Sequence, residues 1–86
     1  MRNEKVYVLL KQRLNSPNNV LVKVFSTEEK AWEQIEKTYY NMMLLFDIQN
    51  VVIGWNSVTI HHWKDRGDGY KEYYITRYII FEKDID

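Results

Sequence analysis

The sequence contains no cysteine, and it has only one proline and three glycines among its 86 residues. Without cysteine the chain can form neither a disulfide bond nor a zinc site with thiolate ligands. Small secreted domains usually depend on disulfides or bound metals for stability. The absence of cysteine therefore favours a protein that works in a reducing cytoplasm.

Long apolar segments are missing as well. The longest unbroken apolar run, residues 42–46, has five residues, whereas a helix that spans a membrane needs about 20. The first residues also lack the apolar stretch of a secretion signal. We therefore expect an unprocessed cytoplasmic protein that does not cross a membrane.

The chain carries no net charge, because 12 Lys and Arg residues balance 12 Asp and Glu residues. This balance excludes a histone-like polycation and an acidic mimic of nucleic acid. The charges are nevertheless unevenly distributed. Residues 1–25 carry a net charge of +4, residues 26–50 carry −3, and residues 51–86 carry −1. A basic segment is thus followed by an acidic one.

Apolar and aromatic residues are plentiful. They account for 45% and 15% of the chain, and the aromatic residues are three Trp, seven Tyr and three Phe. Such a chain is too apolar to be disordered, and its length fits one domain, residues 1–86. A domain of this size buries only a small core, so we expect some aromatic side chains at the surface.

The sequence predicts four strands from short, largely apolar segments that are bounded by turn signals. These segments are Val6–Arg13, Val20–Phe25, Val58–Lys64 and Lys71–Phe81. Turns are expected at residues 15–19 and at residues 65–69, where an Asp-Gly pair favours a tight hairpin. Residues 51–53 fit either a short strand or a packed loop, and residues 82–86 fit a frayed acidic tail.

A helix is predicted from Thr27 to Leu45. Ser26 and Glu29 have the spacing of a capping box, in which each side chain accepts a hydrogen bond from the backbone N–H of the other residue. The apolar positions recur every three or four residues, as on one face of a helix. These positions are Trp32, Ile35, Tyr39, Met42 and Phe46.

The predicted fold class is α+β with the order β-β-α-β-β. It consists of a four-stranded, largely antiparallel sheet with one helix packed on one face. The strand at residues 71–81 is apolar on both faces, so both faces should be covered. One helix covers only one of them, and we expect a protein partner or a second copy of the chain to cover the other.

Aromatic residues are concentrated in the C-terminal half, and Tyr and Trp are favoured in protein interfaces. The candidate protein-binding residues are Trp55, Trp63, Tyr70, Tyr74 and Tyr78. We interpret the chain as a small interaction module without catalytic activity or cofactor, acting through an aromatic-rich sheet face or edge. The richness in Lys, Asn, Ile and Tyr indicates an A+T-rich genome, such as that of a phage or mobile element. The partner would then be a host protein that the module inhibits, for example a defence nuclease.

Two alternatives remain open. The basic first hairpin could bind nucleic acid through Lys11, Arg13 and Lys23, with Tyr7 for base stacking, although the same lysines also fit a solvated sheet edge. The second alternative is a small ribonuclease-like toxin with His, Arg, Lys and Tyr side chains around a phosphate. Its candidate residues are His61, His62, Lys71, Tyr74, Arg77 and Tyr78.

His61 and His62 are adjacent in the predicted strand at residues 58–64. Neighbouring residues of a strand point to opposite faces, so His61 and His62 cannot bind one metal ion together. We expect one of them to be packed and the other exposed, and we expect no metal site.

Overall fold

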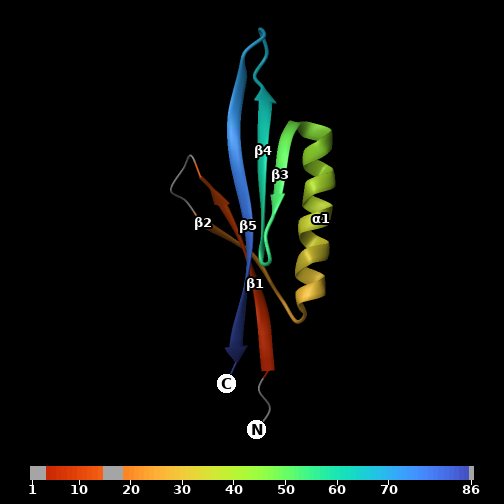
Figure 1. Ribbon diagram of the computed structural model, residues 1–86, viewed down its shortest axis with the longest axis vertical. Helices are drawn as coiled ribbons and strands as arrows, with labels where there is room; N and C mark the ends of the chain where they lie inside the picture. The colour runs from red at the N-terminus through yellow and green to blue at the C-terminus, as the bar shows by residue number, and fades with distance from the viewer. Residues whose placement is uncertain (1–3, 15–18, 86) are drawn as a thin grey trace.

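The computed structural model describes residues 4–14 and 19–85 and shows one helix with a five-stranded antiparallel sheet (Figure 1). In chain order, the elements are β1 (Glu4–Arg13), β2 (Asn19–Phe25), α1 (Glu28–Leu45), β3 (Asp47–Ile53), β4 (Ser57–Asp65) and β5 (Lys71–Ile85). The predicted α+β class with a single helix is confirmed, but the prediction of four strands is wrong. The turn expected at residues 15–19 falls mostly outside the described residues.

The additional strand, β3, begins directly after the helix. Its residues Ile48 and Val51 are half-buried and pack against the core. The register with β4 shifts between Ile48 and Asn50, and such a shift places an extra residue in one strand. This irregularity interrupts the period of two, so the alternation that would have identified the strand is absent from the sequence.

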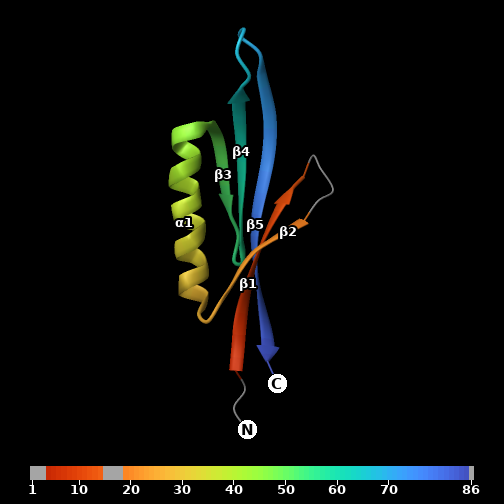
Figure 2. The same cartoon turned by 180° about the vertical axis from the view of Figure 1, so that it is seen from behind.

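The strand order is β2-β1-β5-β4-β3, and every neighbouring pair is antiparallel. The molecule measures 60 × 24 × 18 Å. At one end the β4–β5 hairpin projects beyond α1, and at the other end β1 and the last part of β5 project together (Figures 1 and 2). The central strand β5 therefore links the two halves of the sheet.

The end of β5 differs from the prediction of a frayed tail. Glu4 pairs with Ile85 in the β1–β5 ladder, and the whole segment from residue 82 to residue 85 is strand. An ion pair between Lys5 and Glu82, with an N–O distance of 2.8 Å, lies on this part of the ladder. Because β1 supplies a partner, the acidic segment is ordered as strand.

The helix begins one residue later than the predicted capping box. Thr27, not Ser26, is the N-cap, and its hydroxyl accepts a hydrogen bond from the backbone N–H of Lys30 at 3.2 Å. The extended backbone of Thr27 is the usual N-cap conformation. The acidic residues Glu28 and Glu29 occupy the first turn, where the helix dipole favours negative charge.

The core lies between α1 and one face of the sheet, which we call the helix face; the other is the open face. Ile35 and Met42 of the predicted helical stripe are buried, whereas its other members are half-buried at the margin. Among the described residues, the buried hydrophobic side chains are Leu9, Ala31, Ile35, Met42, Val58, Ile60, Tyr78 and Ile80. On the open face of β5, Phe81 is 46% exposed, and no second layer covers this face in the described part of the chain.

The turn predicted between β4 and β5 is confirmed. Gly67, Asp68 and Gly69 have positive φ angles of 86°, 56° and 74°, a conformation that glycine adopts at little cost and other residues rarely adopt. The side chain of Asp65 accepts a hydrogen bond from the N–H of Gly67 at 2.9 Å. The turn is therefore fixed by backbone conformation as well as by this local hydrogen bond.

Replacing Gly69 with alanine is expected to lower the free energy of unfolding by about 1 kcal/mol. A Cβ atom at this position meets nothing within 4 Å, so the cost comes from the backbone conformation and not from a clash. Asp68→Gly is the matched control and should cost nothing, because glycine tolerates the same positive φ. Urea denaturation measures both variants, and equal stability of Gly69→Ala and the parent protein would contradict the prediction.

Candidate functional site

The helix α1 and the strand β3 lie side by side (Figures 1 and 2). A groove between them is lined by residues of both elements. Its main section has a volume of about 450 Å³ and is lined almost entirely by apolar side chains. The lining residues are Trp32, Ile35, Glu36, Tyr39, Val51, Ile53 and Val58. Such an apolar hollow offers burial to the side chains of a binding partner.

A second hollow of about 340 Å³ extends the groove toward the end of the helix. It shares Tyr39 with the first and is otherwise lined by Met43, Phe46, Asp47 and Ile48. From residue 32 to residue 43 the helix rises about 16 Å, and from residue 48 to residue 53 the strand extends about 17 Å. The two sides therefore match in length, and together they would fit an extended segment of about five or six residues.

The strand that borders the groove is an outer strand of the sheet. β3 pairs with β4 on one side, and within the described residues no strand pairs with its other side. Every second residue of such a strand directs its backbone N–H and C=O groups away from the sheet. Ile53 is 72% exposed and Val52 is 51% exposed. The apolar groove thus lies beside backbone groups that can pair with an added strand.

The rim of the groove is acidic. Glu36 lines the groove, and Glu29 lies seven residues earlier on the same side of the helix. Neither carboxylate takes part in an ion pair with another described residue. The groove is therefore suited to a segment that combines apolar side chains with a Lys or Arg side chain.

The aromatic residues predicted to bind protein do not share one surface. Tyr78 is buried in the core with 4% of its surface exposed, so it is not available at the surface. Tyr74 lies on the helix face, where its ring stacks on His62 at 5.7 Å between ring centres. Trp55 and Tyr70 are exposed in two different turns. These side chains cannot act together as a single docking surface.

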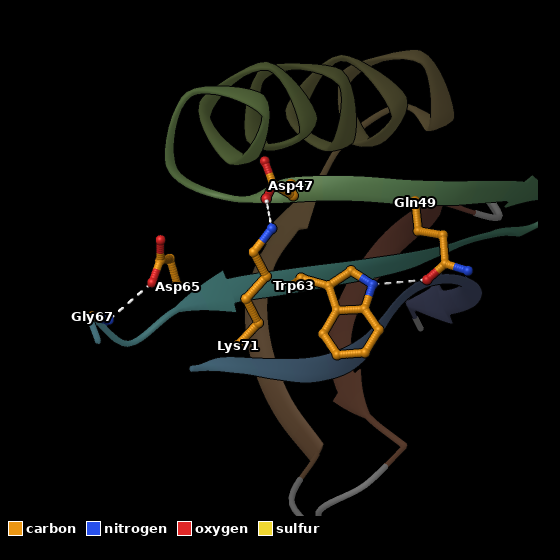
Figure 3. A network of polar contacts seen from close by, with 6 residues as sticks. All are labelled: Asp47, Gln49, Trp63, Asp65, Gly67 and Lys71. Atoms are coloured by element: carbon orange, nitrogen blue, oxygen red, sulfur yellow. Dashed lines mark hydrogen bonds and ion pairs between the residues drawn. The ribbon is translucent and has the colours of Figure 1, made fainter. Parts of the chain in front are cut away.

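Trp63 lies on the open face within a polar network (Figure 3). Its indole N–H donates a hydrogen bond to the side-chain oxygen of Gln49 at 2.9 Å. Nearby, the ammonium group of Lys71 lies 3.2 Å from a carboxylate oxygen of Asp47. These contacts join β3 to β4 and β5, so they hold in place the strand that forms one side of the groove.

The adjacent histidines lie on opposite faces, as predicted. His62 is 2% exposed and its Nε2 atom lies 2.9 Å from the hydroxyl of Thr76, whereas its Nδ1 atom has no hydrogen-bond partner in the described part of the chain. His61 is half-buried and not exposed as expected, and its Nδ1 atom lies 2.5 Å from the hydroxyl of Tyr73. Burial, aided by the positive charges of Arg13 and Lys11, lowers the pKa of His62.

The residues of the ribonuclease-like interpretation are divided in the same way. In the β4–β5 ladder, His61 and Arg77 belong to the open face, whereas His62, Tyr74 and Tyr78 belong to the helix face. Acid–base catalysis requires side chains that converge on one substrate atom, and this set does not converge. Among residues 4–14 and 19–85, no three His, Asp or Glu side chains lie close enough together to hold a metal ion.

The residues predicted to bind nucleic acid do share a face. Tyr7, Lys11 and Arg13 occupy alternate positions of β1, and Lys23 pairs with Leu9, so all four belong to the helix face. Tyr7 packs against the core, and it lines a hollow together with Glu28 and Glu82. Protein atoms therefore cover part of Tyr7, and the three basic residues are the charged members of this set.

The α1–β3 groove was not predicted from the sequence. Trp32 and Tyr39 were recognised as members of the helical stripe, and Val51 and Ile53 were recognised as an apolar segment. No local signal places this segment beside the helix, because the strand order depends on contacts between distant residues. The helical stripe, with its aromatic residues at the margin, was the only hint of a hollow on this side.

Within residues 4–14 and 19–85, the single helix α1 is not long and apolar enough to pass through a membrane. Comparison of the chain with protein-family models, with curated proteins and with solved structures found no match.

Proposed function

We propose that the chain is a small protein-interaction module that binds an extended segment of a partner protein. The segment adds to the free edge of β3 as a further strand, and its alternate side chains enter the α1–β3 groove. The observation that carries this proposal is the position of an apolar groove directly beside an outer strand. Backbone pairing would supply affinity, and the groove would select the side chains.

The residues that line the groove determine which side chains the bound segment should carry. The lining favours β-branched or aromatic side chains at alternate positions, because only every second side chain of a strand points to the helix face. Glu36 at the rim favours a basic residue in the same segment. The proposed partner therefore presents a short strand-forming sequence with apolar residues and at least one Lys or Arg.

Binding of this kind would make the chain an inhibitor if the captured strand belongs to a functional part of the partner. The A+T-rich codon usage inferred from the composition supports an origin in a phage or mobile element. A host defence enzyme, such as a nuclease, is the partner that this origin favours. No catalytic residue and no cofactor enters the proposed mechanism.

The test is a selection of peptides from a random peptide display library on the parent protein. We expect enriched peptides with alternating apolar residues and a basic residue, and these should bind Ile53→Asp about tenfold or more weakly. Val52→Asp is the matched control, because this residue is also exposed on β3 but pairs with Thr59 on the open face. It should keep peptide affinity within about twofold of the parent.

Amide hydrogen exchange supplies a second readout, because a strand added to β3 should slow the exchange of its outward N–H groups. The proposal fails if no peptide is enriched, if Ile53→Asp and Val52→Asp bind the enriched peptides equally well, or if the peptides protect no amide of β3.

A further inference from the structure

A cluster of three basic residues lies on the helix face, toward the edge of the sheet that is opposite the α1–β3 groove. We call Lys11, Arg13 and Lys23 the basic cluster. They belong to β1 and β2, whereas the groove is formed by α1 and β3 at the opposite edge. Figure 2 shows the β1–β2 hairpin diverging from α1, with β4 and β5 between them.

The spacing of the basic cluster is regular. Lys11 and Arg13 are two residues apart, and Lys23 is level with Leu9, two residues before Lys11. Alternate residues of a strand are separated by about 7 Å. The backbone positions of the three residues are therefore regularly spaced on one face of the sheet, along a path that an extended single strand of nucleic acid could follow.

The positive charge of the cluster is not neutralised by the protein. None of the three residues forms an ion pair with another described residue. Burial and the neighbouring charge of Arg13 lower the pKa of Lys11, and no carboxylate opposes this shift. The nearest basic residue of the β4–β5 turn, Arg66, is instead paired with Glu72. An anion at the cluster would relieve the repulsion between its charges.

Aromatic rings hold two of the cations in place. The guanidinium of Arg13 lies 5.2 Å from the centre of the Tyr74 ring, and the ammonium group of Lys23 lies 5.5 Å from the centre of the Phe25 ring. Such cation–π contacts restrict where each charge can lie. His62 stacks on the ring of Tyr74 as well, so this ring is already occupied and is not open to a nucleic-acid base.

We propose that the basic cluster binds the phosphate backbone of single-stranded nucleic acid. The contacts are to phosphates and not to bases, so binding is independent of sequence and weakens steeply with salt. This site is separate from the proposed peptide groove, and the two can be occupied together. Binding of nucleic acid at the basic cluster can therefore be tested independently of peptide binding in the groove.

Fluorescence anisotropy of a labelled single-stranded oligothymidylate tests the inference, at salt concentrations from about 25 to 200 mM. Each phosphate contact in a single strand contributes about −0.7 to the slope of log K against log salt, so three contacts predict a slope of about −2. Combining Lys11→Gln, Arg13→Gln and Lys23→Gln should weaken binding about tenfold or more and bring the slope close to zero.

Single variants keep the test decisive if the triple variant does not fold. Lys23→Gln removes one exposed lysine of the cluster and should reduce the slope by about 0.7, whereas Lys30→Gln removes one exposed lysine of α1 and should leave it unchanged. Three results would each overturn the inference: no binding at the lowest salt concentration, equal effects of Lys23→Gln and Lys30→Gln, or equally effective competition by polyglutamate.

Discussion

Replacing Ile60 with alanine is expected to lower the free energy of unfolding by about 3 kcal/mol. Ile60 is completely buried and lies in β4 between Val51 of β3 and Thr76 of β5. The loss combines the transfer free energy of the missing methyl and methylene groups with the cost of the cavity that they leave. A domain of this size has a total stability of only about 4–13 kcal/mol, so a large fraction is lost.

Urea denaturation followed by tryptophan fluorescence measures this change, and thermal unfolding should show a midpoint about 12–24 °C lower. Val52→Ala is the matched control, because it shortens an exposed β-branched side chain on the neighbouring strand. It should cost less than about 1 kcal/mol. A loss below about 1 kcal/mol for Ile60→Ala would show that the core is not centred on this residue.

The second large effect is a loss of stability in acid that depends on His62. Burial first, and then the charges of Arg13 and Lys11, lower the pKa of this histidine in the folded protein. In the unfolded chain, histidine titrates near pH 6.5. The unfolded state therefore binds a proton more readily, so stability is complete above about pH 6.5 and falls as the pH decreases below it.

The slope from this one group reaches at most about 1.4 kcal/mol per pH unit. His62→Gln should remove this component, so its stability should change less between pH 7 and pH 5 than that of the parent. His61→Gln, on the open face, should keep the acid sensitivity caused by His62. The prediction is wrong if the parent and His62→Gln lose stability equally over this range of pH.

Local signals predicted the helix and four strands because each of these elements has a regular pattern. The spacing of Ile35 and Met42 identifies the buried side of α1, and the Asp-Gly pair identifies the β4–β5 turn. For β3, the sequence indicates only a short strand or a packed loop at residues 51–53, because a register shift disrupts the alternation of this strand. The last part of β5 was misjudged because its stability comes from pairing with β1, whose residues lie far away in the sequence.

The candidate sites were less predictable than the elements. Aromatic residues that are close in sequence, such as Tyr70 and Tyr74, end up in different surroundings, because they belong to a turn and to the helix face. The shared face of Lys11 and Arg13 could be predicted, because alternate residues of one strand point to the same face. The α1–β3 groove requires knowledge of the strand order, which no local pattern contains.

The pairing of Glu4 with Ile85 also bears on how the chain reaches its native structure. Local hairpins and the helix can form from nearby residues, but the central β1–β5 ladder joins the two halves of the sheet only when the last strand is available. Such long-range closure slows folding, because the entropy of closing the loop is lost before the distant contacts form. On a ribosome, the sheet would therefore stay divided until β5 has emerged and can pair with β1.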